Sequence, residues 1–261
     1  MMLSVQDLTV HYGSTLAISH VDLAIDPGRI VAIVGESGSG KSTLIRSVMG
    51  LLPSYGRISS GKIILNGRDI STIDAREWRA IRGSQVAMIF QDTSASLNPI
   101  RRIGSQLCEY IRQHRDISST QAWKLASDML ASLGLPDPDD LMRRYPFQLS
   151  GGMSQRVGIA MAMMLEPQLL LADEPTSALD TTTQAQIVEE MMRLRDQSKT
   201  AIVMVTHNMA LACYMADEIM VMQKGKVVDR GDRIAIMNNS AHPYTKNLLA
   251  SMPTMYGERY V

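Results

Sequence analysis

Short apolar runs of strand length recur along the chain and alternate with helical periodicity. The runs "IVAIV" (30–34), "LLLAD" (169–173), "AIVMVT" (201–206) and "EIMVM" (218–222) are nearly continuous apolar stretches, typical of strands buried on both faces. Residues 182–197, between the second and third runs, have the amphipathic pattern of a helix. Strands that alternate with helices predict a parallel sheet with crossover connections, and therefore an α/β fold.

The first quarter of the chain has a different strand pattern. Apolar and polar side chains mix in residues 3–10, and "HVDLAI" (20–25) follows, which predicts edge-type strands. Asn66-Gly67 is a strong signal for a two-residue hairpin, and "QKGKVVDRGD" (223–232) predicts another. Hairpin-connected strands are therefore expected near the N-terminus and again late in the chain.

Helical periodicity dominates from about residue 95 to 165, interrupted by "LPDPDD" (135–140), and it returns after about residue 234. We therefore expect an inserted helical subdomain inside a core that is made in two parts. The first part of the core, with its N-terminal strands, is predicted at 1–94 and the helical subdomain at 95–165. The second part of the core follows at 166–233, and a helical tail at 234–261.

Composition narrows the classes of function. Lys+Arg and Asp+Glu number 26 each among 261 residues, so the formal net charge of zero gives no bulk electrostatic case for nucleic-acid binding. No apolar run approaches the roughly 18 residues of a membrane span, and the first ten residues lack the pattern of a signal peptide. Cys108 and Cys213 lie far apart and fit two reduced thiols of a cytosolic protein.

The stretch "GESGSGKST" (35–43) fits the phosphate-loop pattern G-x-x-x-x-G-K-[ST], with a buried strand predicted before it and a helix after it. Glycines let successive backbone N–H groups point inward, and the helix N-terminus adds a field that favours anions. Lys41 is expected to reach the β- and γ-phosphates and Ser42 to bind Mg²⁺. The alternative without a ligand is a flexible glycine turn with a surface lysine. The predicted nucleotide-binding residues of this loop are Gly35, Glu36, Ser37, Gly38, Ser39, Gly40, Lys41, Ser42 and Thr43.

"LLLADEP" (169–175) has the pattern of the second half of a nucleotide site. The strand carries Asp173 to its C-terminal end, where a carboxylate can hold the Mg²⁺ shell. Glu174 follows directly and is placed to polarise an attacking water. An acidic pair after a strand can also be a solvated loop, but the phosphate loop upstream favours the nucleotide interpretation.

Further features stand in a fixed order around these two motifs. Tyr12 precedes the phosphate loop, Gln91 follows a predicted strand, and His207 follows another. "QLSGGMSQR" (148–156) pairs two glycines with a serine at a predicted helix start, and "SALD" (177–180) follows the acidic pair. Each feature alone is weak, since aromatic, amide and imidazole side chains at such positions are commonly structural. In this order they resemble the ATP-binding subunits of ABC transporters over nearly the whole chain, with "LSGGM" as the family's signature.

The resemblance implies a P-loop NTPase (ABC ATPase) core of the α/β class, with an antiparallel β subdomain and an inserted α-helical subdomain. It also implies that two such subunits pair head to tail, with each ATP held between one chain's phosphate loop and the other chain's signature helix. The signature would then be a second anion site at a helix N-terminus, serving the nucleotide of the partner. The residues expected to contact ATP across that interface are Ser150, Gly151, Gly152, Gln155 and Asp180.

The remaining roles follow from the resemblance, position by position. Tyr12 would stack on adenine, and Glu174 would be the catalytic base. His207 would hold the γ-phosphate and Glu174, and Gln91 would touch Mg²⁺ and the attacking water. The expected Mg²⁺ ligands are Ser42, Gln91 and Asp173. One departure from the family pattern is Asn208, where Asp is usual; because both residue types cap helices, little loss is expected.

Two segments narrow the subfamily. "FQDTSASLNP" (90–99), in which Thr93 replaces a usual proline, and "HPYTKNLLASMP" (242–253) resemble the ATPases of oligopeptide, dipeptide and nickel importers. "GGM" in the signature resembles the D-type member of their ATPase pairs. Because no cysteine follows Cys213, no iron–sulfur cluster is expected, and the sequence tilts slightly toward the branch that imports nickel or a metal chelate.

The expected partners are a second, F-type ATPase chain, two membrane permease subunits and an extracytoplasmic substrate-binding protein, at the cytosolic face of the membrane and without nucleic acid. One alternative is an accessory ATPase of a non-transport complex such as a carbon–phosphorus lyase system. Another is an ABC ATPase that acts on DNA or ribosomes. That class usually carries coiled coils, tandem cassettes or a basic arm, and this sequence has none of them.

Overall fold

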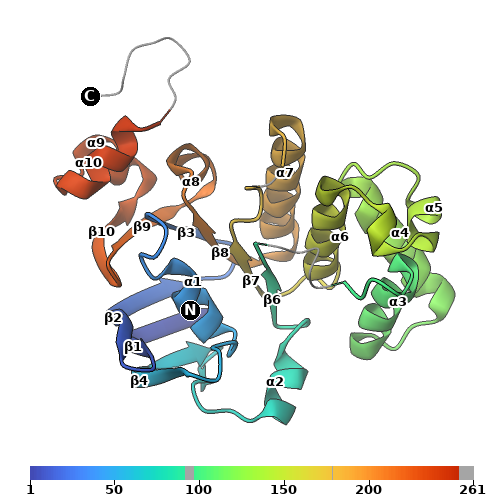
Figure 1. Ribbon diagram of the computed structural model, residues 1–261, viewed down its shortest axis with the longest axis horizontal. Coiled ribbons are helices and arrows are strands. Elements are labelled where there is room, and N and C mark those ends of the chain that lie inside the picture. Colours follow the sequence, from blue (N-terminus) through green and yellow to red (C-terminus); the bar gives the residue numbers. More distant parts are fainter. Residues whose placement is uncertain (92–96, 178, 253–261) are drawn as a thin grey trace. The chain divides into compact units, whose positions relative to one another are not determined.

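The computed structural model describes residues 1–91, 97–177 and 179–252, which divide into two compact units. Unit 1 combines the two ends of the sequence, 1–80 and 201–261, and unit 2 consists of residues 81–200. Figure 1 shows the chain coloured along its length. Thr93 and most of the run after Gln91 lie outside the described residues, as do the 94/95 division, Ala178 and everything from Pro253 onward.

An antiparallel sheet in unit 1 contains the N-terminal strands. Its order is β2-β1-β4-β5, so β1 has a hydrogen-bonded neighbour on each side. The expectation that the first strand lies at an edge is therefore wrong. The alternating pattern reports only that one face is buried, as Leu3, Val5, Leu8 and Val10 are, and an interior strand of such a sheet has the same pattern. The strands are β1 (Leu3–Tyr12), β2 (Thr15–Ile25), β4 (Gly56–Leu65) and β5 (Arg68–Asp69).

A second sheet contributes strands to unit 1, and one of them, β3 (Ile30–Val34), is fully buried, as the continuous apolar run predicts. β3 pairs in parallel with β8 (Ala201–Thr206) on one side and β9 (Glu218–Gln223) on the other. β10 (Lys226–Asp232) returns antiparallel to β9. The neighbours of β3 thus come from the other end of the sequence. The helices of this unit are α1 (Lys41–Val48), α2 (Ala75–Ile81, at the boundary between units), α8 (Met209–Met215), α9 (Arg233–Asn239) and α10 (Pro243–Ala250).

Both expected hairpins are confirmed. Asn66 and Gly67, with φ of 49° and 79°, connect the paired residues Leu65 and Arg68. A second two-residue turn, 224–225, also has positive φ at both positions and connects β9 to β10. Positive φ at both central residues is the geometry that a tight hairpin between right-twisted strands requires.

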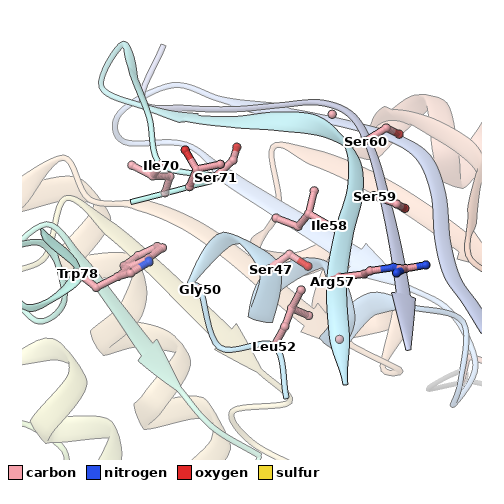
Figure 2. Close-up of a pocket in the computed structure, with 13 residues that line it drawn as sticks. Ser47, Gly50, Leu52, Arg57, Ile58, Ser59, Ser60, Ile70, Ser71 and Trp78 are labelled. Atoms are coloured by element: carbon pink, nitrogen blue, oxygen red, sulfur yellow. The ribbon is translucent and has the colours of Figure 1, made fainter. Parts of the chain in front are cut away.

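A cavity of about 450 Å³ lies in unit 1 beside the end of α1 and strand β4 (Figure 2). At its wall the ring of Trp78, which is 8% exposed, lies against Gly50. A Cβ atom at residue 50 would stand 2.4 Å from two Trp78 ring atoms. Helix α1 ends at Val48, because Gly50 has φ of 64° and turns the chain out of the helix.

Unit 2 is mostly helical and contains two paired strands. β6 (Val86–Ile89) and β7 (Leu169–Asp173) run in parallel, with Ile89 opposite Ala172. Helix α4 is closed at its start by a capping box of Ser118 and Gln121. The helices are α3 (Ile103–His114), α4 (Ser119–Ser132), α5 (Pro138–Arg143), a short 3₁₀ turn (Pro146–Gln148), α6 (Gly151–Met163) and α7 (Thr181–Ser198).

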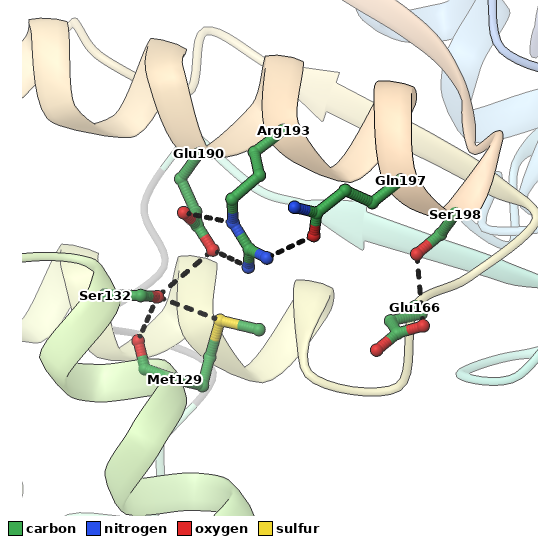
Figure 3. Close-up of polar contacts among 7 residues, drawn as sticks. All are labelled: Met129, Ser132, Glu166, Glu190, Arg193, Gln197 and Ser198. Atoms are coloured by element: carbon green, nitrogen blue, oxygen red, sulfur yellow. Dashed lines mark hydrogen bonds and ion pairs between the residues drawn. The ribbon is translucent and has the colours of Figure 1, made fainter.

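A buried carboxylate connects the end of α4 to α7 (Figure 3). Glu190, 6% exposed, accepts hydrogen bonds from the Arg193 guanidinium and from the Ser132 hydroxyl. Arg193 holds the pKa of the Glu190 carboxyl below its ordinary value; burial opposes this shift, and Ser132 adds to it. The charge is therefore paired and hydrogen-bonded, as a buried carboxylate requires.

Among the described residues, no helix combines the length and apolar character needed to cross a membrane.

Candidate nucleotide-binding site

The phosphate loop connects β3 directly to α1. Residues 31–35 are buried, 36–38 are exposed, and Ser39 and Lys41 are buried again. Only the middle of the loop is therefore exposed to solvent, and both of its ends are buried in unit 1. Gly40, with φ of 103°, stands at the N-cap of α1 and offers no side-chain cap. Helix α1 therefore begins directly after the glycine-rich loop, and a loop of this kind that leads into a helix N-terminus is the arrangement that binds phosphate.

Gly35 begins the loop where no side chain fits. Its φ is 155°, and a Cβ atom there would lie 2.2 Å from the backbone oxygen of Met222 on β9. The first glycine of the motif is thus fixed by a neighbouring strand as well as by backbone freedom.

Lys41 has its ammonium group folded back over the loop. The Nζ atom donates to the carbonyl oxygens of Gly35 and Glu36, 2.7 Å away in each case, and lies 3.4 Å from Ser39 Oγ. The residue is only 5% exposed. Its charge is therefore held by oriented dipoles in the centre of the loop, where a phosphate oxygen can be met.

Tyr12 lies at the end of β1, and its hydroxyl donates to Thr43 Oγ1 across 3.2 Å. Its ring meets the ring of Tyr55 edge-on, with 5.6 Å between centroids. The structure therefore brings Tyr12 to the first turn of α1, beside the phosphate loop. Stacking of its ring on adenine stays a prediction.

His207 follows the last residue of β8 and is exposed. Asn208 is the N-cap of α8, and its side-chain oxygen accepts from the N–H of Leu211 at 3.1 Å. The expectation that Asn208 still caps a helix is confirmed. The cap fixes the turn on which His207 stands.

In unit 2 the ends of β6 and β7 bring Gln91 and Glu174 to the same edge. Each residue stands two positions beyond the opposed pair Ile89 and Ala172, and the strands are parallel. Asp173 is 1% exposed at the last position of β7. The expectation that Gln91 and Asp173 lie at the ends of strands fits the described geometry, and the structure adds that the two strands are neighbours.

Glu174 has an unusual backbone. Its φ is 48°, rare for a residue with a side chain. Its carbonyl oxygen accepts from both the N–H and the hydroxyl of Ser177, at 3.3 and 3.2 Å. A sharp turn therefore follows β7 immediately and sets the direction of the carboxylate, a kind of strain that concentrates at functional sites.

The signature segment forms the start of α6. Ser150 is the N-cap, and its hydroxyl accepts from the N–H of Met153 at 3.3 Å. Ser150 and Gly151 are exposed, and a Cβ atom at Gly151 would meet nothing within 4 Å. The nearest approach at Gly152 is to the Leu179 side chain, 3.7 Å away. This helix start is therefore open to an anionic partner.

Two other residues expected at the interface have partners inside unit 2. Gln155 is 4% exposed, and its amide nitrogen donates to the carbonyl oxygen of Pro175 at 2.9 Å. Asp180 caps α7 through the N–H and hydroxyl of Thr183, which together lower the pKa of its carboxyl. Contact of either residue with a second chain stays a prediction.

Sequence reasoning missed one contact to the phosphate loop. The N–H of Glu36 donates to the hydroxyl of Tyr244, 2.8 Å away. Tyr244 belongs to the "HPYT" segment, which in the sequence indicates the subfamily but no role at the nucleotide site. Proximity between residues 208 positions apart leaves no local pattern, so no signal in a single sequence could have revealed it.

Comparison with known sequences decides the family. The family model described as ABC transporter matches residues 18–177. The chain belongs to the ABC transporter family. The dipeptide transport ATP-binding protein DppD of Escherichia coli (strain K12) is 44% identical over 256 residues, covering 97% of this chain and 78% of that protein. The oligopeptide transport ATP-binding protein OppD of Bacillus subtilis (strain 168) is 42% identical over 259 residues, covering 97% and 72%.

Solved structures of ABC transporter cassettes have the same fold. A dimeric, post-hydrolysis structure of the ATP-binding cassette MJ0796, bound to ADP and Pi, superposes with a TM-score of 0.80 and 28% identity, covering 89% of this chain and 99% of that one. CbiO1 from Clostridium perfringens gives 0.77 at 25% identity, covering 91% of each chain. The expected P-loop NTPase fold is confirmed, and as an ABC transporter cassette the chain is an ATP-binding ATPase.

Proposed function

We propose that this chain is the ATP-hydrolysing subunit of a peptide importer. The observation that carries the proposal is the similarity, at 42–44% identity over 97% of the chain, to proteins named for dipeptide and for oligopeptide transport. Identity of this extent covers the phosphate loop, the signature helix and the tail together. Because these relatives are named for peptide transport, they favour a peptide over nickel or a metal chelate, and transport over service to a carbon–phosphorus lyase complex.

The chain would work as one half of a head-to-tail pair of ATPases. The exposed Ser150 and Gly151 at the start of α6 support this proposal, because they leave a helix N-terminus accessible to an anion. The similar cassette MJ0796 is described as dimeric. ATP would then join two subunits, and hydrolysis would release them.

Each proposed catalytic residue has a distinct task. The loop N–H groups and the Lys41 ammonium bind and orient the phosphates, so that charge on the γ-phosphate is stabilised as the bond to it breaks. Glu174 accepts a proton from the attacking water, which Gln91 orients. His207 holds the γ-phosphate oxygen and the Glu174 carboxylate in position. Gln155 and Asp180 hold the signature helix and α7 for the partner subunit's nucleotide.

The donor set fits Mg²⁺. In the described part of the chain no cluster of three His, Cys, Asp or Glu side chains could hold a metal alone. Mg²⁺ usually binds through substrate phosphates and one or two protein oxygens, so no such cluster is needed. The hydroxyl of Ser42, the buried carboxylate of Asp173 and the amide oxygen of Gln91 are hard oxygen donors and would hold it. Bound Mg²⁺ neutralises charge on the β- and γ-phosphates.

We infer that the working assembly contains a different, F-type ATPase chain, two permease subunits and an extracytoplasmic binding protein, with this chain peripheral at the cytosolic face of the membrane. Similarity to proteins named as transport ATP-binding proteins supports this inference. No iron–sulfur cluster is proposed.

The test is isolation of the native membrane complex through a tag on this chain. Mass spectrometry should find one further ATPase, two permeases and a peptide bound to the binding protein, and a cognate dipeptide should stimulate ATP hydrolysis. Nickel or a chelate as the bound ligand would overturn the substrate class. Two copies of this chain alone would overturn the heterodimer, and co-purified phosphonate enzymes would overturn transport.

A further inference from the structure

One peptide group at the start of the phosphate loop is held from both sides. The N–H of Glu36 donates to the hydroxyl of Tyr244 at 2.8 Å. The carbonyl oxygen of Gly35, in the same peptide group, accepts from Lys41 Nζ at 2.7 Å. In a trans peptide the N–H and C=O point in opposite directions within one rigid plane. The tyrosine hydroxyl therefore fixes the plane whose other side holds the lysine ammonium.

Tyr244 is placed by a buried anchor. It is 7% exposed in the first turn of α10, and the next residue, Thr245, is fully buried. The Thr245 hydroxyl donates to Asp229 Oδ2 on β10 at 2.8 Å, and the Ser240 hydroxyl donates to the same oxygen. Burial raises the pKa of Asp229, but these two hydrogen bonds, that of the Arg230 N–H and the nearby His242 together outweigh it, so the carboxyl stays an acceptor with a lowered pKa.

The far side of the loop is braced as well. The N–H of Gly225, in the turn between β9 and β10, donates to the carbonyl oxygen of Ser39 at 3.0 Å. Together with Met222 against Gly35, these contacts give the loop three supports from residues beyond 220. Tyr244 differs from the other two because its contact uses a side chain, and a side-chain hydroxyl can be removed without changing the backbone.

We propose that Tyr244 is a positioning residue of the ATP site, which sets the Gly35–Glu36 peptide and through it the Lys41 ammonium. The "HPYT" segment then has a physical task. It connects the tail helix α10 to nucleotide affinity, so that displacement of α10 weakens ATP binding. Tyr244 itself touches the loop backbone and is not a catalytic residue.

The test compares two substitutions that each remove one phenol hydroxyl. Tyr244→Phe keeps the ring and removes the contact to Glu36. Tyr110→Phe, in unit 2, is the matched control, because it also removes a phenol hydroxyl that is shielded from solvent. Burial raises the pKa of Tyr110 to about 12, and residue 110 is far from the phosphate loop in the sequence. The dissociation constant of the full chain for a fluorescent ATP analogue with Mg²⁺ is measured, together with the unfolding temperature without nucleotide.

We expect Tyr244→Phe to weaken nucleotide binding about three- to tenfold, the range of one hydrogen bond. Tyr110→Phe should leave the dissociation constant unchanged, even if its unfolding temperature falls by as much as that of Tyr244→Phe. A purely structural Tyr244 would lower the unfolding temperature and leave affinity intact, which would overturn the proposal. So would equal weakening by the two variants.

A second pair keeps the proposal testable if Tyr244→Phe folds poorly. Thr245→Val removes the hydroxyl that donates a hydrogen bond to Asp229 and keeps the shape of the side chain, whereas Thr245→Ser keeps the hydroxyl. Thr245→Val should weaken nucleotide binding in the same direction as Tyr244→Phe, and Thr245→Ser should restore most of it. Equal affinity in the two Thr245 variants would show that the anchor of α10 does not act on the loop.

Discussion

The side-chain amide of Gln155 donates a hydrogen bond to the backbone carbonyl of Pro175, across 2.9 Å. Gln155 lies in the second turn of the signature helix, and Pro175 directly follows Glu174. Both residues are buried. Within one chain, the helix proposed to contact a partner's nucleotide is thus bonded to the segment that carries the proposed base.

Replacing Gln155 by Leu should slow ATP hydrolysis by the assembled transporter about tenfold, because loss of one buried hydrogen bond of roughly 1.4 kcal/mol disturbs the segment after Glu174. Affinity of the isolated chain for ATP should not change, since the phosphate loop lies in unit 1. Gln197→Leu, an amide on the outer part of α7, is the control and should keep the wild-type rate. An unchanged rate in Gln155→Leu would contradict the coupling.

Glu174→Gln should leave ATP binding intact and reduce turnover by at least a hundredfold, because an amide cannot accept the proton of the attacking water. Steady-state phosphate release and nucleotide titration on the same preparation give the two quantities. The variant should also accumulate as a nucleotide-bound pair in size-exclusion chromatography. Hydrolysis at the wild-type rate would show that another group is the base.

Ser150→Arg should abolish hydrolysis by the complex without weakening ATP binding to the isolated chain, because the serine serves the nucleotide of the partner. Ser118→Arg is the matched control. Both serines are exposed N-caps whose hydroxyl accepts from a backbone N–H, at 3.3 Å for Ser150 and 3.2 Å for Ser118. Loss of the cap alone costs about 1 kcal/mol in either helix. A matched loss of ATP affinity in monomeric Ser150→Arg would sink the idea of a shared site.

Glu190→Gln should lower the free energy of unfolding at pH 7 by roughly 1–3 kcal/mol, because the Arg193 ion pair and its hydrogen bonds are lost. The carboxyl has a lowered pKa in the folded state, so its contribution is complete above the unfolded value of 4.5 and disappears as pH falls through the folded value. Urea unfolding at pH 7 and below pH 4 should therefore show a difference that shrinks with acid.

Glu189→Gln provides the control for that measurement, since Glu189 is the exposed neighbour of Glu190 on the same helix. It should change the free energy of unfolding by less than about 0.5 kcal/mol at either pH. A Glu190→Gln difference that stays constant with pH would mean that the carboxylate charge does not stabilise the fold.

Gly50→Ala should destabilise unit 1 by roughly 2–4 kcal/mol. The new Cβ would combine the strain of φ at 64° with a 2.4 Å approach to the Trp78 ring. Gly67→Ala separates the two causes, because Gly67 has φ of 79° but open space around it. It should cost about 1–2 kcal/mol, the backbone part alone. Equal unfolding temperatures for the two variants would remove Trp78 from the explanation.

Local patterns predicted much of this molecule. The buried strand before Gly35, the hairpin at Asn66-Gly67 and the cap at Ser150 each depend on a few consecutive residues, and each is where the sequence indicates. The interior place of β1 was not predictable, because alternation reports burial of one face and says nothing about the number of neighbouring strands. The turn at Glu174 was missed for a related reason, since only surrounding structure keeps a side-chain residue at positive φ.

Contacts between distant segments account for the rest. Tyr244 against Glu36, Met222 against Gly35 and Gln155 against Pro175 each place a polar or backbone atom where only the folded chain can put it. A single sequence fixes which residues can make such bonds but not which pairs do. The four-part division of the chain likewise stays a prediction beside the two compact units.

The pairing of β3 with β8 and β9 has a consequence for biosynthesis. The ribosome completes the phosphate motif at residue 43, but the strands that flank β3 begin at residues 201 and 218. Tyr244 emerges later still. Because a nascent chain grows at about 5–20 residues per second, the motif waits roughly ten seconds or more for the residues that shape it. The residues that pair with β3 and contact the phosphate loop are therefore all present only after residue 244 has been made, and full nucleotide affinity is expected no earlier than that.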